Sequence, residues 1–178
     1  MNESAGRPAR TGGLERMHRV VDASLRAIIG IIFAVLVVCV VWQVVSRYVF
    51  GTPSTVTDEL ARFLFMWLAL IGGAYTLGLK RHLAIDLLPL SLKGAAERNL
   101  RLVIVGMVAA FAGLVMVYGG GQLLLGVLQT GQVSPVLRVQ MGYVYGAIPF
   151  SGLVMLFYCG LSARDILMGH DVAPLMGD

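Results

Sequence analysis

Four long runs without a charged residue constrain this chain more than any other feature of its sequence. They cover residues 27–46, 63–79, 102–137 and 139–163. About 20 apolar residues in a helix are enough to cross the roughly 30 Å hydrocarbon core of a bilayer. A cleaved signal peptide would need a shorter apolar stretch followed by small residues, so we interpret the first run as an uncleaved anchor. The runs predict an all-α integral membrane protein with four transmembrane helices, at about 21–49, 57–79, 96–128 and 141–164.

The composition agrees with a membrane protein. Charged residues make up 13% of the 178 residues, whereas soluble domains have about a quarter, and the mean hydropathy is +0.80. The net charge of +4 comes from basic residues that flank the apolar runs. We therefore interpret these residues as topology signals beside the lipid bilayer, and we expect no nucleic-acid partner.

The basic residues divide unevenly between the two sides of the predicted bundle. Eleven of the fourteen lysines and arginines fall before helix one, between helices two and three, or after helix four. Because basic residues are retained in the cytoplasm, we predict a multi-pass protein of the bacterial inner membrane with both termini cytoplasmic. Residues 19–165 form the predicted membrane domain, with flexible cytoplasmic tails at 1–18 and 166–178 and a short interfacial segment between helices two and three.

The connection between helices one and two brings four charged residues to the predicted periplasmic rim. Asp58 and Glu59 fall in the first turn of helix two, where the helix dipole favours negative charge. Arg62 follows Asp58 by four residues and can pair with it, and Arg47 ends helix one at the same depth. Two compatible interpretations remain open: helix capping with local ion pairing, or a docking surface for a periplasmic partner.

The predicted interfacial segment carries His82 and Asp86, four residues apart at the cytoplasmic interface. A metal site would need further ligands, so a structural bond is the favoured interpretation. The two cysteines, Cys39 and Cys159, lie in apolar runs without CxxC spacing. We interpret them as small apolar filler rather than as a disulfide or metal pair. The sequence predicts no metal and no cofactor.

Small residues recur at four-residue spacing inside the predicted spans. Such pairs let helix backbones approach closely in a bilayer, where no hydrophobic effect drives helix association. A proline within a helix removes a backbone hydrogen bond and bends it. The predicted helix-packing positions are Gly73, Gly113, Gly142, Gly146 and Pro149.

The middle of each predicted span holds no Asp, Glu, Lys, Arg or His. Ion-coupled carriers place ionisable residues at that depth, and a haem-bearing anchor needs histidines there. Catalytic groups are missing from the spans for the same reason. The chain is therefore predicted to be neither an enzyme nor a carrier on its own, but an accessory subunit.

Several sequence patches, taken in their order and spacing, resemble the small membrane subunit of tripartite ATP-independent periplasmic (TRAP) transporters, the DctQ-like family. The resemblance covers about residues 18–165. The patches are 46–51 at the end of helix one, 58–62 and 65–72 in helix two, 82–86 in the inner segment and 141–149 in helix four.

The resemblance implies a transporter of three parts. A soluble periplasmic binding protein captures an organic acid, a large membrane subunit carries it with sodium, and the small subunit braces the large one. The acid stays open among dicarboxylates, sialic acids, other sugar acids and sulfonates. The alternative is a four-helix membrane scaffold or assembly factor unrelated to transport. By position, the resemblance implies structural or docking roles for Arg47, Asp58, Glu59 and Arg62 on the periplasmic rim, and for His82 and Asp86 on the cytoplasmic rim.

Overall fold

The computed structural model describes residues 12–79 and 95–168. Within these two ranges the regular structure is helical, and the single β-type pairing is an isolated bridge between Val133 and Gln140. Four helical stretches are long and apolar enough to cross a membrane. The predicted all-α fold with four transmembrane helices is therefore confirmed. The membrane-length stretches are Arg16–Tyr48, Thr55–Gly78, Arg98–Thr130 and Met141–Leu167.

Three segments lie outside the described residues: 1–11, 80–94 and 169–178. The predicted interfacial segment, with His82 and Asp86, falls in the second of them. Most of the two predicted tails falls in the other two.

The first two helices are α1, Gly12–Tyr48, and α2, Thr55–Leu79, which pack against each other as an antiparallel hairpin. Helix α1 begins earlier than the predicted start at 21, so the end of the predicted flexible tail is helical. Good helix formers at 14–17 favour this extension. A contact between His18 and Asp22 four residues later, 3.0 Å from Nδ1 to Oδ2, supports the first turns of the helix.

The third membrane crossing is one continuous helical path in three parts. It starts as α4, Ala95–Phe111, widens into the π-helix η2, Ala112–Gly119, and continues as α5, Gly120–Thr130. The sequence predicts one helix here, at about 96–128 and loosened by the glycines at 119–121, but no π-helical part. The π-helical stretch packs onto Gly152 of the fourth crossing, where an added Cβ would lie 2.7 Å from the Cβ of Met116. The third crossing thus changes from α-helix to π-helix where it packs against a glycine of the fourth crossing.

The fourth crossing is divided at Gly146 into α6, Met141–Tyr145, and α7, Ala147–Leu167. The break precedes Pro149 by about one turn. Because proline has no N–H, the carbonyl of Tyr145 has no partner four residues later. The bend predicted at Pro149 is therefore seen as an interruption of the helix one turn earlier.

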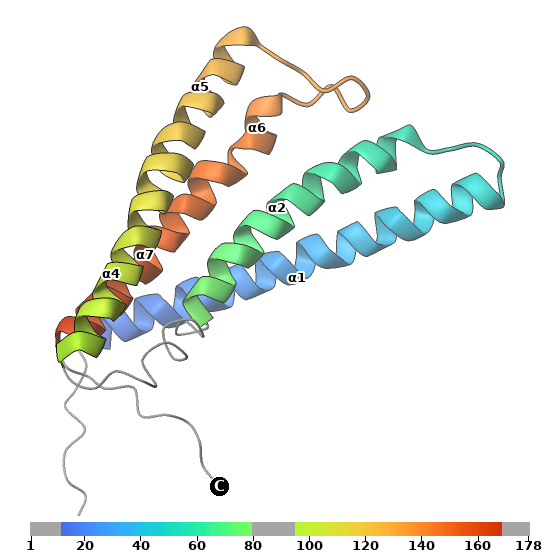
Figure 1. Cartoon of the computed structure of the whole chain (residues 1–178). Coiled ribbons are helices and arrows are strands. Elements are labelled where there is room, and N and C mark those ends of the chain that lie inside the picture. The colour runs from blue at the N-terminus through green and yellow to red at the C-terminus, as the bar shows by residue number, and fades with distance from the viewer. Residues whose placement is uncertain (1–11, 80–94, 169–178) are drawn as a thin grey trace, which may run out of the picture.

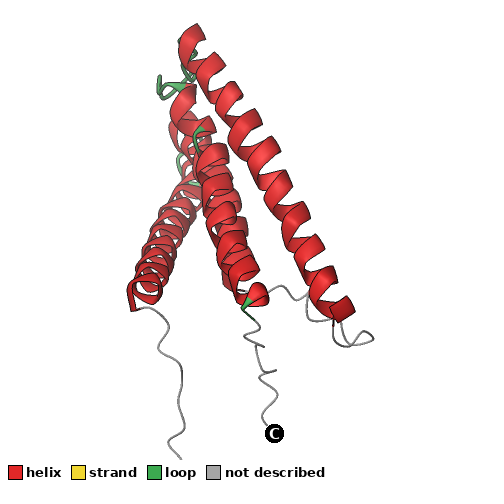
Figure 2. Cartoon of the chain, turned by 90° about the vertical axis from the view of Figure 1, so that its left-hand side faces the viewer, coloured by secondary structure: helices red, strands yellow, loops and turns green. Residues whose placement is uncertain are grey.

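The four crossings form two helical hairpins, which in the view of Figure 1 lie close together at the bottom and apart at the top. One hairpin is α1 with α2, and the second joins α4, η2 and α5 to α6 and α7. Seen from the side, the helices instead lie together at the top and stand apart at the bottom (Figure 2). We call the end with the loops 49–54 and 131–140 the loop end. The base end is where α1 and α4 begin and α2 and α7 end.

The buried core lies towards the base end and is small. One cluster joins Leu25, Ile71 and Tyr158 from three helices, and a second contains Val105 and Cys159. Helix α7 packs against α2, α4 and η2, so it holds the two hairpins together.

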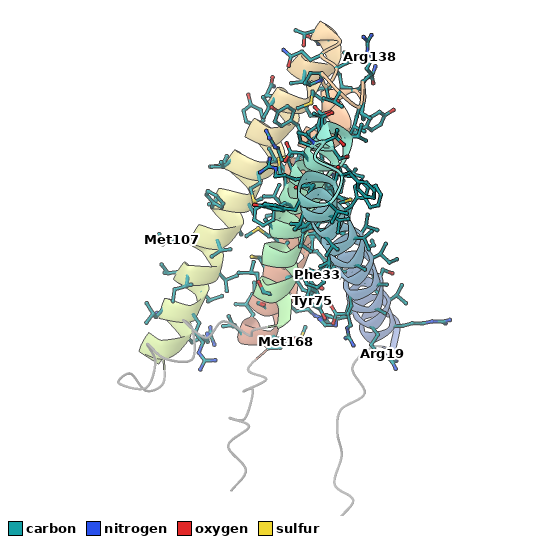
Figure 3. The ribbon with its side chains drawn as sticks, turned by 90° about the vertical axis from the view of Figure 1, so that its right-hand side faces the viewer. Arg19, Phe33, Tyr75, Met107, Arg138 and Met168 are labelled. Atoms are coloured by element: carbon teal, nitrogen blue, oxygen red, sulfur yellow. The ribbon has the colours of Figure 1, made fainter. Side chains whose placement is uncertain are left out.

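Much of the apolar surface of the helices faces outward. In the most apolar window of the first crossing only 6% of residues are buried within the chain, against 33% in the fourth. Figure 3 shows the side chains along the helices, among them Met107, which is 69% exposed. Apolar surface of this extent is stable in contact with lipid or with another membrane protein.

Candidate functional site at the loop end

Glu59 anchors the loop 131–140 to the start of α2. Its carboxylate oxygen Oε2 accepts a hydrogen bond from the backbone N–H of Leu137 at 2.7 Å and from that of Val136 at 3.2 Å. The hydroxyl group of Ser134, a residue that is 1% exposed, lies 3.3 Å from the same oxygen. Hydrogen bonds to a carboxylate are about twice as strong as those between neutral groups. Glu59 therefore connects the two hairpins at the loop end.

The loop 131–140 is also shaped by its own backbone. The N–H of Ser134 donates to the carbonyl of Val139, and the N–H of Met141 donates to that of Gln132, both at 2.9 Å. These bonds close the loop into a narrow turn, which leaves Arg138 at its tip on the loop end of the molecule (Figure 3).

Asp58 and Arg62 form an exposed ion pair on the first turns of α2. The distance from Arg62 Nη2 to Asp58 Oδ2 is 2.5 Å, and the side chains of Arg62 and Asp58 are 75% and 50% exposed, respectively. Exposed pairs of this kind contribute about 0–1 kcal/mol to stability. The neighbouring acids thus differ: Asp58 faces solvent with a partner on its own helix, whereas Glu59 holds a distant loop.

A groove of about 510 Å³ lies between the end of α1 and the start of α2. Arg47 from α1 and the Asp58–Arg62 pair from α2 line it and leave it with a formal charge of +1. We call it the arginine groove. Its other lining residues are Gln43, Val44, Tyr48, Pro53, Ser54 and Thr55.

The connection 49–54 fixes the two walls of the arginine groove. Gly51 adopts a left-handed conformation, with φ of +69°, which glycine tolerates without steric cost. The hydroxyl group of Ser46 donates to the carbonyl of Thr52. Deeper in the groove, Gln43 Nε2 donates to the carbonyl of Thr57 at 2.9 Å and joins α1 to α2.

The structure therefore brings Arg47, Asp58 and Arg62 together at one groove and turns Glu59 towards the loop 131–140. This arrangement is compatible with both interpretations drawn from the sequence, which are capping with local ion pairing and a docking surface. Local pairing is present at Asp58, and an exposed charged surface is present beside it. Sequence reasoning did not anticipate the role of the loop, because its contacts with Glu59 span more than 70 positions along the chain.

Two of the predicted packing positions lie at close contacts between helical segments. A Cβ added at Gly142 of α6 would overlap the side chain of Leu128 of α5. Pro149 lies against Gly120, where an added Cβ would be 3.3 Å from the proline Cδ. At Gly146 an added Cβ would be 3.3 Å from the carbonyl oxygen of Gly142, within the same bent crossing.

The other two predicted packing glycines have room around them. Nothing among the described residues lies within 4 Å of a Cβ added at Gly73, and only Leu156 reaches 4.0 Å at Gly113. Close approaches that the sequence analysis missed occur at Gly78, Gly120 and Gly152.

A polar cluster at the base end was also missed. The buried Tyr158 of α7 donates its hydroxyl hydrogen to Asp22 of α1, which also pairs with His18. The Tyr158 ring lies against Gly78 of α2, where a Cβ would be 2.6 Å from it. A buried tyrosine hydroxyl group usually has a hydrogen-bond partner. The position of this tyrosine inside an apolar run was therefore the sequence signal for the cluster. The sequence could not say which helix would supply the partner.

Within the described residues, no group of three or more His, Cys, Asp or Glu side chains is placed to hold a metal ion. Cys39 and Cys159 are both buried and unpaired, on different helices. The arrangement offers hydrogen-bonded supports and one charged groove at the rim.

Three curated proteins resemble this chain in sequence. The C4-dicarboxylate TRAP transporter small permease protein DctQ of Rhodobacter capsulatus is 33% identical over 56% of this chain and 44% of its own length. A putative TRAP transporter small permease protein of Haemophilus influenzae is 23% identical over 80% and 86%, respectively. The sialic acid TRAP transporter small permease protein SiaQ of Vibrio cholerae is 30% identical over 58% and 61%. The matches thus span less than two thirds of the first and third relatives.

The model of one protein family matches residues 36–167, which is most of the chain. That family is described as the DctQ component of tripartite ATP-independent periplasmic transporters. The matched region contains the connection 49–54, the Asp58–Arg62 pair, Glu59 and the loop 131–140. The chain therefore belongs to the DctQ family, the small membrane subunits of TRAP transporters.

Proposed function

We propose that this small permease subunit braces the large membrane subunit of its transporter, without carrying substrate itself, and helps to dock the periplasmic binding protein. The complex would take up an organic acid together with sodium. Both termini would be cytoplasmic, with the loop end in the periplasm.

The observation that carries the proposal is how the few polar side chains within the spans are used. Ser151 donates to the carbonyl of Ile148, and Thr76 donates to that of Gly73, each one turn away on its own helix. Gln43 is bonded to the start of α2. An anion that crosses with cations needs polar contacts at mid-depth. The two hydroxyl groups are thus satisfied within their own helices and Gln43 joins α1 to α2, which suits a supporting subunit.

The outward apolar faces support the bracing role. The first crossing is almost unburied within the chain, and Gly73 and Gly113 leave room for a close neighbour. Small residues at such positions allow another helix to approach closely in a bilayer.

The class of substrate is supported by the relatives. One is named for a C4-dicarboxylate and another for sialic acid, and both of these are organic acids. We propose an organic acid for this transporter on that basis.

Docking of the binding protein is assigned to the exposed charges of the loop end: Arg47, Asp58, Arg62 and Arg138. Glu59 supports this face indirectly, because it holds the loop that carries Arg138. Complementary charges at an interface accelerate association, and the acceleration decreases as salt increases.

The docking role can be tested with D58N in the assembled complex. Because Asp58 is half exposed, its loss should leave the subunit folded. We expect the association rate of the binding protein at low salt to change by about two- to tenfold, because D58N alters the charge of the docking face. The matched control is Q129K, which also raises the charge by one at an exposed position of the loop end. If D58N and Q129K both associate like the unmodified complex, Asp58 has no docking role.

A further inference from the structure

We propose that the arginine groove binds the phosphodiester headgroup of a membrane phospholipid, with a preference for a net negative headgroup such as that of phosphatidylglycerol. The lipid would enter from the bilayer side, with its acyl chain along α1. This site goes beyond the proposed role in transport and does not depend on which side of the membrane the loop end faces.

The charge of the groove suits a phosphodiester. Arg62 is paired with Asp58, whereas the side chain of Arg47 has no ion pair or hydrogen bond within the described parts of the chain. One positive charge is therefore uncompensated, and a phosphodiester carries one negative charge. The guanidinium group offers a planar fork of donors that matches the oxygens of a phosphate.

The groove also has the size and the donors of a headgroup site. Its volume of about 510 Å³ falls within the roughly 300–1,000 Å³ of small-molecule sites. The hydroxyl-bearing residues Tyr48, Ser54 and Thr55 line it beside the arginines. Its walls come from two helices and the connection between them, so the donors of all three segments border one space.

The polar groove continues into an apolar stripe. Val44 lines the groove and is 53% exposed. Val40 and Val37 precede it by four and seven residues, so all three share one face of α1, and they are 45% and 43% exposed. A charged pocket at the end of an exposed apolar stripe matches a molecule with a charged head and an apolar tail.

Neither a lone surface arginine nor an acidic protein partner would use the whole of this arrangement. An isolated arginine that extends to the headgroup region needs no second helix and no groove. An acidic side chain of a soluble protein partner would satisfy the charge but could not cover the valine stripe, which runs into the membrane span. The continuity between groove and stripe therefore favours the phospholipid.

The test measures lipid retention by the full-length chain in nanodiscs that contain phosphatidylglycerol and phosphatidylcholine with identical acyl chains. Bound lipids are counted by native mass spectrometry. We expect the unmodified chain to retain phosphatidylglycerol in preference to phosphatidylcholine. R47Q and R62Q should each lower that retention about tenfold, and R47K, which keeps the charge without the fork, should fall between.

The control is R138Q, which removes an exposed arginine from the same end outside the groove and should retain phosphatidylglycerol like the unmodified chain. Circular dichroism verifies that each variant keeps its helices. Equal retention by R47Q and the unmodified chain would overturn the proposal, as would an equal loss in R138Q, which would mean general attraction to charge. Complete displacement of the lipid by millimolar inorganic phosphate would assign the site to a free anion instead. Loss of binding-protein affinity in R47Q, with lipid retention unchanged, would assign the groove to the protein.

Discussion

Asp58 and Glu59 are adjacent in sequence and alike in chemistry, yet they serve different structural purposes. The first turns of α2 direct Asp58 to Arg62 on the same exposed face. They direct Glu59 to the loop 131–140, where it accepts bonds from two backbone N–H groups and meets the hydroxyl group of Ser134. The difference arises from a rotation of about 100° between successive residues of a helix.

Removing each carboxylate separately should expose this difference. E59A leaves the N–H groups of Val136 and Leu137 without their acceptor, which should cost about 1–3 kcal/mol of stability. D58A removes an exposed pair and should cost about 0–1 kcal/mol. Hydrogen–deuterium exchange of the loop 131–140 provides the measurement, with faster exchange expected in E59A alone. Similar exchange in both variants would show that Glu59 is not the anchor.

The sequence placed these charges at one end of the helices but could not assign their partners. A capping pattern and four-residue spacing are local signals, and they predicted the pairing of Asp58 with Arg62. The contact of Glu59 with Leu137 and that of Asp22 with Tyr158 depend on how separate helices pack. No local pattern contains that information.

Single glycines decide how closely the helical elements approach. Met116 of η2 packs closely against Gly152, and Ile148 of α7 packs closely against Gly120. The ring of Tyr158 packs in the same way against Gly78. Each of these glycines lies where two crossings touch, and a specific neighbouring side chain occupies the space that a Cβ would fill. Gly106 of α4 has no neighbour within 4 Å among the described residues.

Alanine substitution should therefore have opposite effects at these positions. G152A places a Cβ 2.7 Å from Met116 Cβ and 3.2 Å from the carbonyl oxygen of Ala112, so the π-helical stretch must shift. We expect a loss of about 1–3 kcal/mol. G106A should leave stability unchanged or raise it, by up to about 1 kcal/mol, because alanine favours helix over glycine. Unfolding of the purified chain in detergent compares the two. G152A being as stable as G106A would refute the close packing.

At the level of elements, the sequence predicted the number of membrane helices and most of their ends. Apolar runs bounded by charges and turns carry that information because a bilayer requires them. The π-helix η2 and the break at Gly146 were not predicted as such. Both occur where the third and fourth crossings pack together, and their cause lies in that contact as much as in the local residues.

At the level of the whole molecule, two hairpins join at the base end and are connected across the loop end through Glu59. The sequence also predicts an orientation, since the base end collects most of the basic residues. The exposed fractions of side chains in the structure identify positions at which labelling can measure this orientation. Ser134 is 1% exposed and unsuitable, whereas Gln132 and Met168 are exposed at opposite ends.

The orientation can be measured with single cysteines at these two positions, in a chain in which alanine replaces the buried Cys39 and Cys159. In spheroplasts, a membrane-impermeant thiol reagent should label Q132C and leave M168C unlabelled until the membrane is opened. The reason is the retention of basic residues in the cytoplasm. Labelling of M168C in intact spheroplasts would reverse the predicted topology.

The central claim is that this subunit supports transport without providing the path for the substrate. The most direct test is uptake into proteoliposomes under a sodium gradient, with a labelled C4-dicarboxylate or sialic acid loaded on the binding protein. We predict no sodium-dependent uptake with this chain alone, uptake when the large membrane subunit is present as well, and little or none with the large subunit alone. Sodium-dependent uptake by this chain alone, or full uptake by the large subunit in its absence, would contradict the account.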